Sequence, residues 1–408
     1  MEPGVVIVGA GHGAGQVAQS LRQFGYEGTI TLIGEEDCAP YQRPPLSKAW
    51  LAGDVGLEDV LFKPAEFWTT QNIEVITGRK VVSISPNDKQ VSCDNEASVP
   101  YTHLILATGG RARRLGCVGE DLAGVQVLRT LKDASVLSEA MQNGRRLVIV
   151  GGGYIGLEVA ATARKRGLDV TLLEAEARVL ARVAGKDMST FFERVHGEHG
   201  IKIMTGALAE SFEGTDRLSG VRLADGTVLA ADIAVVGIGL IPNDALAKEA
   251  GLVCDNGIVV DAQCRTSGPD IYALGDVTRH PSAIYGRALR LESVHNALEQ
   301  AKTAAGTIMG REKTYNQVPW FWSDQYDLKL QIAGLSAGYN DTVMRGDPSV
   351  NAFAVFYFRD GALIACDAVN APAEYMAARM MIARGSSPDR QALVDMAVPM
   401  KEIMMQAQ

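Results

Sequence analysis

The chain has 408 residues, of which 47% are hydrophobic and 21% are charged, and its formal net charge is −9. This composition is typical of a globular protein and argues against a disordered chain. The acidic balance argues against a generic nucleic-acid binder, and the length predicts about two to three domains.

Targeting and membrane signals are missing at the level of sequence. The first residues, MEPG, lack the basic and apolar regions of a signal peptide, and the longest apolar stretch, 147–163, is broken by three consecutive glycines and by Glu158. The six cysteines form no CxxC pair and are few for a disulfide framework. We therefore expect a cytoplasmic protein without membrane contact.

A strand–turn–helix–strand pattern begins the chain. The apolar run 4–8 leads into the turn GAGHGAG, a helical pattern follows, and residues 29–36 predict a second strand that ends in acids. Gly9, Gly11 and Ala14 fit the G-x-G-x-x-G/A dinucleotide fingerprint. Gly9 permits the tight turn, Gly11 leaves room for a pyrophosphate, and a small third residue lets the helix pack closely.

Glu35 lies 26 positions after Gly9, where a carboxylate can accept hydrogen bonds from a ribose. An ordinary glycine turn of an α/β fold is the simpler alternative, but the complete pattern favours dinucleotide binding.

The same pattern returns with a strand at 146–150, the turn GGGYIG, a helix at 157–167 and a strand at 169–176. Gly151, Gly153 and Gly156 match the fingerprint without substitution, and Glu174 ends the second strand. An acid at this place favours the free 2′-hydroxyl of NADH, although the nearby Arg178 leaves NADPH open.

Later segments complete an α/β chain that contains two Rossmann-like units and a carboxyl-terminal α+β domain. Three more predicted strands end in glycine turns, at 103–110, 232–243 and 270–278. A group of antiparallel strands is predicted from about residue 318, and the last part, 372–408, is predicted to be helical.

Several longer motifs make the sequence similar to a known family. They are IVGAGHGAG, PYQRPPLSKAWL, ILATGG, VIVGGGYIGLEVAATA, VVGIGLIPN, IYALGDV, PWFWSDQYD and VPMKEI. In this order they resemble the FAD-dependent, NADH-linked ferredoxin reductases of bacterial oxygenase systems, the putidaredoxin reductase and aromatic-ring dioxygenase reductase family. The resemblance spans nearly the whole chain, with departures at Ala14 and at His295, where proline is frequent in the family.

The resemblance implies a glutathione-reductase-like fold and a domain order. It places a discontinuous FAD-binding domain at 1–109 and 240–313, an NADH-binding domain at 110–239, and the carboxyl-terminal domain at 314–408. It also implies contacts to FAD or NADH from Gly9, Gly11, Gly13, Ala14, Glu35, Arg43, Pro44, Lys48, Val81, Ala107, Thr108, Gly109, Arg129, Gly275, Asp276, Val294, Trp322, Gly151, Gly153, Ile155, Gly156, Glu174 and Gly239.

The resemblance further implies that Lys48 and Glu158 form a catalytic pair near the flavin and the nicotinamide. A lysine cation can stabilise the electron density of a reduced flavin, while a carboxylate keeps the lysine charged and oriented. Without the resemblance, each would be read as a solvated surface charge. Hydride transfer needs positioning of the two nucleotides and no protein nucleophile.

The cysteines and histidines are not expected to carry chemistry. Without a CxxC pair, electrons should leave the flavin directly, and the position of Cys38 does not fit the single-cysteine reductases. His196 and His199 lack further ligands, so we expect a solvated helix end and no metal site.

The predicted activity is that of an NADH-dependent oxidoreductase of the EC 1.18.1 type. It would pass electrons to a [2Fe–2S] ferredoxin that supplies a P450 or a ring-hydroxylating oxygenase. The resemblance suggests that the ferredoxin docks near Trp322, Lys302 and Lys401. We expect Trp320 and Trp322 on opposite faces of one strand, although from the residues alone both would pack in the core.

The alternatives are a rubredoxin or monodehydroascorbate reductase on the same fold, or a redox-sensing flavoprotein similar to apoptosis-inducing factor.

Overall fold

The structure is a computed structural model that describes residues 3–311 and 313–407. Its contacts divide the chain into two compact units. Unit 1 comprises 1–43, 57–111 and 241–319, and unit 2 comprises 44–56, 112–240 and 320–408. Segments 44–56 and 320–408 thus group with the middle of the chain, and the three-domain division expected from the sequence stays a prediction.

Among the described residues of unit 1, a seven-stranded sheet has the order β3-β2-β1-β6-β5-β4, with β18 also paired to β6. Its strands are β1 (Gly4–Val8), β2 (Ile30–Ile33), β3 (Ile73–Ile76), β4 (Val81–Ser85), β5 (Gln90–Cys93), β6 (Ser98–Leu106) and β18 (Ile271–Ala273). The pairs of β1, β2, β3, β6 and β18 are parallel, whereas β4 and β5 add an antiparallel hairpin. All five residues of β1 are buried, which explains its unbroken apolar run.

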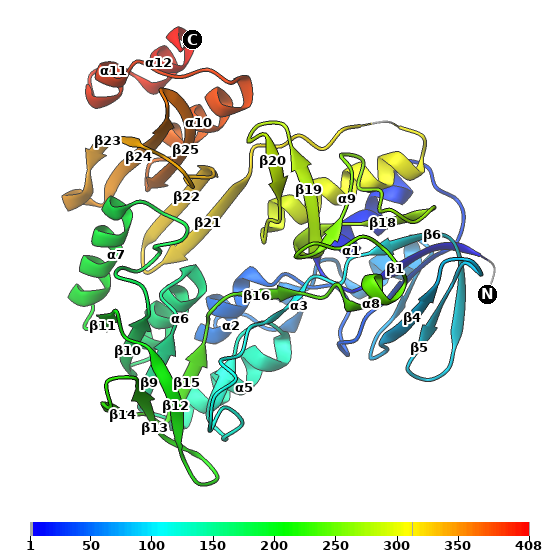
Figure 1. Cartoon of the computed structure of the whole chain (residues 1–408), viewed down its shortest axis with the longest axis horizontal. Helices are drawn as coiled ribbons and strands as arrows, with labels where there is room; N and C mark the ends of the chain where they lie inside the picture. Colours follow the sequence, from blue (N-terminus) through cyan, green and yellow to red (C-terminus); the bar gives the residue numbers. More distant parts are fainter. Residues whose placement is uncertain (1–2, 312, 408) are drawn as a thin grey trace. The chain divides into compact units, whose positions relative to one another are not determined.

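The helices described in unit 1 are α1 (His12–Gln23), α3 (Leu57–Val60), α4 (Ala65–Thr70), α8 (Ala245–Glu249) and α9 (Val294–Ile308). Of these, α1, α4 and α8 pack on strands of the sheet. Helices α1 and α9 pack against each other (Figure 1). A smaller sheet joins β17 (Ile258–Val259), β19 (Thr278–Ser282) and β20 (Arg287–Leu289), and the short helix η2 (Gly275–Val277) follows β18. The chain passes between the units in β7 (Gly110–Ala112) and β16 (Leu240–Pro242).

Unit 2 contains a parallel sheet of order β11-β10-β9-β15-β8. The strands are β8 (Val125–Val127), β9 (Arg146–Val150), β10 (Asp169–Glu174), β11 (Lys202–Thr205) and β15 (Ile233–Val236). The helices of this part are η1 (Pro44–Ser47), α2 (Ala49–Ala52), α5 (Leu131–Asn143), α6 (Tyr154–Lys165) and α7 (Lys186–Glu198). A three-stranded antiparallel sheet joins β12 (Ala209–Gly214), β13 (Leu218–Leu223) and β14 (Val228–Ala230).

The carboxyl-terminal part of unit 2 is an antiparallel sheet of order β21-β22-β25-β24-β23, as the sequence predicted. Its strands are β21 (Trp320–Gln325), β22 (Leu328–Gly334), β23 (Asp341–Asp347), β24 (Ala352–Arg359) and β25 (Ala362–Val369), with η3 (Pro348–Val350) between β23 and β24. Helix α10 (Pro372–Arg384) packs on β25 and β22, and α11 (Arg390–Val394) and α12 (Met400–Gln406) follow (Figure 1).

A buried arginine fastens the last helices to this sheet. Arg345, on β23, is 4% exposed and forms an ion pair with Glu374 at 3.2 Å. Its guanidinium also donates to the backbone carbonyls of Leu393, Asp395 and Val398. One side chain therefore connects β23 to α10 and to the segment that holds α11 and α12.

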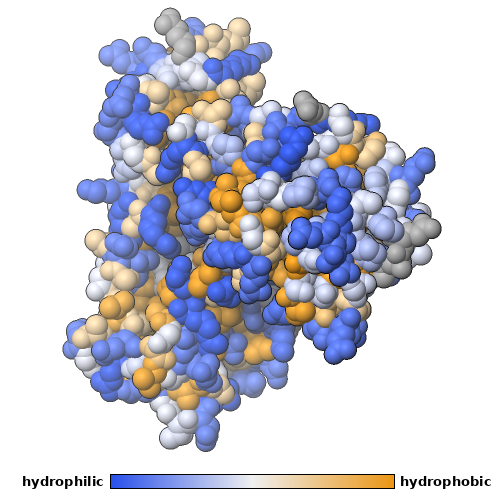
Figure 2. Space-filling view, turned by 45° about the vertical axis from the view of Figure 1, so that its right-hand side comes forward, coloured by the Kyte–Doolittle hydropathy of each residue, from blue (hydrophilic) through white to orange (hydrophobic). Residues whose placement is uncertain are grey.

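On the face drawn in Figure 2, hydrophilic residues are interspersed with scattered hydrophobic ones. No helix in the described part of the chain is both long enough and apolar enough to cross a bilayer.

Candidate functional site

The first glycine turn, in unit 1, follows β1. Gly9 has a φ of +112°, and a Cβ there would lie 2.3 Å from the carbonyl oxygen of Ala107. A Cβ on Gly13 would lie 2.3 Å from the Leu274 side chain. Gly11 is different, because no atom lies within 4 Å of the place of its Cβ. The protein's own packing thus requires Gly9 and Gly13, whereas the space beside Gly11 is open to a ligand.

The second glycine turn, in unit 2, repeats this arrangement. Gly151 has a φ of +113°, and its Cβ would lie 2.4 Å from the carbonyl oxygen of Gly237. A Cβ on Gly156 would lie 2.1 Å from the carbonyl oxygen of Gly151, while Gly153 again has no atom within 4 Å. In both fingerprints only the middle glycine is unexplained by packing.

Each open glycine is the N-cap of a helix. Neither α1 nor α6 has a side-chain cap at its N-terminus, and neither has an acidic residue in its first turn. A helix N-terminus with this character favours an anion, since its first N–H groups point outward and its dipole is positive there. The residues of both turns therefore fit the pyrophosphate of a dinucleotide.

Acids after the second strands differ between the units. In unit 1, Glu35 is exposed and lies 3.2 Å from the Lys80 ammonium. The neighbouring Glu36 accepts hydrogen bonds from Tyr41 at 2.7 Å and from Arg43 at 2.8 Å. Burial alone would lower the pKa of Arg43, because it disfavours the charged guanidinium. The nearby Tyr41, Glu36 and Asp276 favour the charged form more strongly, so the pKa of Arg43 is raised.

In unit 2, the structure brings Glu174 to the second glycine turn. Its carboxylate accepts hydrogen bonds from the backbone N–H groups of Gly152 and Glu176, each at 2.8 Å. Arg178 donates instead to Ser189 and to the carbonyls of Ala181, Ala184 and Gly185. Because these contacts engage the guanidinium, Arg178 is poorly placed to take a 2′-phosphate.

Gln300 holds the turn that contains Gly275 and Asp276. Gly275 has a φ of +80°, and its N–H donates to the buried Gln300 side chain at 2.7 Å. Thr278 lies within hydrogen-bond distance of the same Gln300 oxygen, at 2.9 Å. Sequence reasoning missed Gln300, because no helix was predicted where the structure has α9.

The other predicted cofactor residues are distributed over both units. Thr108, between Ala107 and Gly109 at the end of β6, exchanges hydrogen bonds with Asn243 at 2.8 and 3.1 Å. The rest lie at element boundaries or within elements: Ala14 in α1, Val81 at the start of β4, Val294 at the start of α9, Pro44 at the start of η1, Arg129 after β8, Ile155 in α6, Gly239 before β16 and Trp322 in β21.

Lys48 and Glu158 form an ion pair within unit 2. The Lys48 ammonium lies 2.8 Å from Glu158 Oε2 and also donates to the carbonyl of Pro44 at 3.2 Å. The Glu158 side chain is 1% exposed and the Lys48 side chain 19%. Glu158 is thus a buried partner, and the alternative of two independent surface charges is wrong.

Two hydroxyl groups complete the surroundings of the Glu158 carboxylate. Ser47 donates to Oε2 at 2.5 Å, and Ser323 donates to Oε1 at 2.7 Å. These three donors, Ser47, Ser323 and Lys48, stabilise the negative charge of the buried carboxylate. Without them, burial would strongly disfavour the charged form. The η1 segment supplies Ser47 and Lys48, and Thr162 of α6 fixes that segment by donating to the Ser47 carbonyl at 3.0 Å.

Our expectation that Trp320 and Trp322 face opposite ways was wrong. Residues two apart in a strand share a face, and the two ring centroids lie 5.5 Å apart. Phe321 points to the other face, where its ring lies 5.0 Å from that of Tyr154. Both tryptophans are half-buried.

The expectation of a solvated helix end at His196 was also wrong. His196 is fully buried, and it contacts Gln325 at 2.8 Å and Tyr326 at 3.2 Å. Burial lowers its pKa to about 4. Within residues 3–311 and 313–407, no group of three or more histidine, cysteine, aspartate or glutamate side chains could hold a metal ion.

All six cysteines are free thiols. Burial and the charge of Glu36 raise the pKa of Cys38, which disfavours a reactive thiolate.

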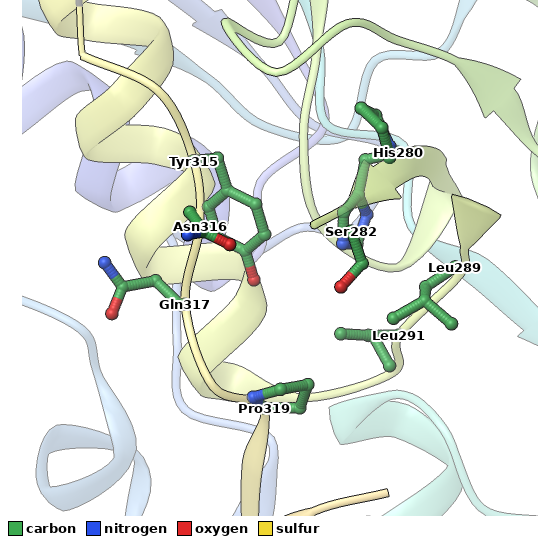
Figure 3. A pocket seen from close by; sticks show the side chains of 9 residues that line it. His280, Ser282, Leu289, Leu291, Tyr315, Asn316, Gln317 and Pro319 are labelled. Atoms are coloured by element: carbon green, nitrogen blue, oxygen red, sulfur yellow. The ribbon is translucent and has the colours of Figure 1, made fainter. Parts of the chain in front are cut away.

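A hollow in unit 1 is lined by residues of the segments 280–291 and 315–319, close in sequence to Asp276 and Val294. The residues that line this hollow are His280, Pro281, Ser282, Leu289, Leu291, Tyr315, Asn316, Gln317 and Pro319 (Figure 3). The rings of His280 and Tyr315 meet edge to face at 5.0 Å, and Tyr315 donates to Asn296 at 2.8 Å. Of the described residues that line this hollow, none is a predicted cofactor contact.

Comparison with known proteins agrees with this geometry. The family model for pyridine nucleotide-disulphide oxidoreductases matches residues 3–301, and the reductase C-terminal model matches residues 320–404. The chain is 44% identical to the 5,5′-dehydrodivanillate O-demethylase ferredoxin reductase subunit of a Sphingobium species, over 98% of this chain and 97% of that protein. It is 43% identical to putidaredoxin reductase of Pseudomonas putida, over 98% of this chain and 96% of that protein.

A solved structure, that of the covalent putidaredoxin reductase–putidaredoxin complex, matches with a TM-score of 0.96 and 41% identity. The match covers 100% of this chain and 99% of the solved chain. The chain therefore belongs to the pyridine nucleotide-disulphide oxidoreductase family, in its branch of FAD- and NADH-dependent ferredoxin reductases of oxygenase systems.

Proposed function

We propose that the chain oxidises NADH and reduces a [2Fe–2S] ferredoxin that supplies a P450 or a ring-hydroxylating oxygenase. The observation that carries this proposal is the absence of a CxxC pair from this sequence, which belongs to the disulphide oxidoreductase family. Without a dithiol, the chain offers no relay to a disulfide substrate, so electrons leave the flavin directly. FAD, when bound, supplies both the two-electron chemistry with NADH and the single-electron chemistry with a cluster.

The chain's own contribution is binding, orientation and fixed charge. The open turns beside Gly11 and Gly153 would hold the two pyrophosphates, with Glu35 and Glu174 available to the riboses. Asp276, on the turn held by Gln300, would accept hydrogen bonds from a polyol of the flavin nucleotide. Lys48 would present its cation to the flavin, and Glu158 fixes the position of that cation through the 2.8 Å ion pair.

Lys48→Ala tests the role of this pair. We expect the long-wavelength absorbance band of the NADH-reduced protein to weaken, because the variant loses the charge that faces the flavin. Lys132→Ala is a matched control, since Lys132 is an exposed lysine of α5 in the same unit. An unchanged band in Lys48→Ala would contradict the proposed role.

Docking of the ferredoxin is proposed near Trp322, Lys302 and Lys401. Lys401 is exposed on α12, whereas Lys302 is a half-buried lysine of α9 that pairs with Glu299 at 2.6 Å. Both protein partners would be acidic overall, so local positive charges are needed for encounter. Ferredoxin reduction should then slow as salt is added, and Lys401→Glu should slow it further at low salt. Rates independent of salt would exclude a mainly electrostatic surface.

An acceptor panel tests the proposed activity. NADH-reduced protein is mixed in a stopped-flow instrument with a [2Fe–2S] ferredoxin, a rubredoxin or monodehydroascorbate, and absorbance is followed at flavin and cluster wavelengths. We expect fastest reduction of the ferredoxin. Faster reduction of another acceptor would favour the corresponding reductase, and slow reduction of all three would favour a redox-sensing flavoprotein. The free cysteines support a cytoplasmic location.

A further inference from the structure

A row of hydrogen bonds leads away from the Glu158 carboxylate inside unit 2. Ser323 lies 2.7 Å from Glu158 Oε1, and Gln325 Nε2 lies 3.1 Å from Ser323 Oγ. Gln325 Oε1 lies 2.8 Å from His196 Nε2, and His196 Nδ1 lies 3.2 Å from the Tyr326 hydroxyl. Ser323, Gln325 and His196 are each at most 1% exposed. The row therefore joins β21 and α7 to the ion pair without access to water along most of its length.

The donors and acceptors of this row can be assigned by elimination. A carboxylate only accepts, so the single hydroxyl proton of Ser323 points to Glu158. Ser323 must then accept from the Gln325 amide nitrogen, which turns the Gln325 oxygen toward His196. His196 consequently carries its proton on Nε2 and accepts on Nδ1 from Tyr326. The low pKa of His196, about 4, agrees with a neutral ring that has one proton.

All four hydrogen bonds consequently point in one direction, from Tyr326 toward Glu158. Hydrogen bonds aligned in this way polarise one another, and a bond from a hydroxyl to an ionised carboxylate is stronger than a neutral one. The row thus directs the positive end of the Ser323 O–H dipole at Oε1 of Glu158. Lys48 and Ser47 donate to the other oxygen, Oε2. Loss of the Ser323 hydroxyl would leave Oε1 buried without a donor, and the carboxylate would rotate to find one.

We propose that Ser323, Gln325, His196 and Tyr326 are positioning residues that fix the orientation of Glu158 and, through it, of Lys48. They act on the reaction of the proposed function, on which this inference rests, without touching substrate or cofactor. None of the four was selected by sequence reasoning for this role. Their contribution should be seen in hydride transfer from NADH, the step in which the placement of Lys48 matters.

The test uses the FAD-containing protein and NADH alone. In Ser323→Ala and Gln325→Met, we expect about tenfold slower reduction by NADH and a weaker long-wavelength band, with unchanged flavin content. Ser323→Thr keeps a hydroxyl and should restore most of the rate. Tyr326→Phe removes one hydroxyl at the far end with little change of volume, and about a twofold effect is expected.

Ser387→Ala is the control, because Ser387 is a half-buried serine of unit 2 whose hydroxyl oxygen accepts a hydrogen bond from the Leu363 N–H at 2.9 Å and belongs to neither the row nor the glycine turns. Wild-type reduction rates in both Ser323→Ala and Gln325→Met would overturn the proposal. An equal loss in Ser387→Ala would also overturn it, since the effect would then reflect general loosening of unit 2.

A second readout is independent of activity. Nitrogen-15 NMR of histidine-labelled protein, assigned with His196→Gln, should show His196 neutral with its proton on Nε2; a proton on Nδ1 would refute the assigned direction. The outcomes are separable from those of the proposed function, because no ferredoxin is present. If NADH does not reduce the wild-type protein, the proposed function and this inference both fail. If NADH reduces the protein but the protein reduces ferredoxin poorly, only the proposed electron acceptor is wrong.

Discussion

Asp367 offers a quantitative test of the packing in unit 2. It lies on β25, is 1% exposed, and accepts a hydrogen bond from the Tyr357 hydroxyl at 2.7 Å. Its Oδ1 has no hydrogen-bond partner among the residues that the structure describes. Burial raises the pKa of Asp367 from 3.8 to about 7, even though the bond from Tyr357 opposes the rise.

The sign of the stability effect follows from this rise. The folded protein binds the Asp367 proton more tightly than the unfolded chain, so this group stabilises the fold fully below about pH 4. That stabilisation is lost as the pH rises through about 7, with a total of about 4 kcal/mol. Between about pH 5 and pH 8 the loss should be about 3 kcal/mol.

Asp367→Asn should remove this dependence, because an amide keeps an oxygen for Tyr357 and carries no charge. The free energy of unfolding is measured by urea denaturation of the flavin-containing protein at several pH values, with circular dichroism as the signal. The wild type should lose about 3 kcal/mol more than Asp367→Asn over this pH range. Asp324→Asn, at an exposed aspartate of β21, is the control and should follow the wild type. Parallel curves for wild type and Asp367→Asn would refute the reasoning.

Three further predictions concern the glycine turns, nucleotide choice and the carboxyl terminus. Gly153→Val should raise the KM for NADH about tenfold or more without loss of bound flavin, whereas Gly11→Val should lose flavin, as measured by absorbance of the purified protein. The wild type should have a higher kcat/KM with NADH than with NADPH, and equal values would contradict the role given to Glu174. Arg345→Met should lower the free energy of unfolding by about 3 kcal/mol and expose 390–407 to proteolysis; resistance equal to the wild type would show that its contacts contribute little.

Local sequence patterns were sufficient for the elements that carry the glycine turns. The apolar runs 4–8 and 147–150 coincide with β1 and with the buried part of β9, which begins at the exposed Arg146, because a strand buried on both faces needs apolar residues. Helix α6 begins at Tyr154, three positions before the predicted start, since the end of the glycine turn already forms its first turn. The two fingerprints alone, however, do not distinguish a residue required by packing from one that leaves room for a ligand.

Contacts between distant segments could not be read from local patterns. Lys48 and Glu158 are 110 positions apart, and only the family resemblance joined them. The polar run VHGEHG looks like a solvated helix end, but β21 covers the face that holds His196. Ser323 and Gln325 alternate with Asp324 along that strand, and this spacing was the one signal that they share an inward face.

The Glu158 carboxylate has a consequence for how the chain is made. Its donors Ser47, Lys48 and Ser323 come from an early and a late part of the sequence, and Ser323 is 165 positions beyond Glu158. During synthesis the ribosome must therefore release most of the polypeptide before this acid can be fully enclosed. A nascent chain that stops short of β21 would lack the Ser323 donor to this glutamate of α6, so the carboxylate is fully enclosed only after the carboxyl-terminal strands have been made.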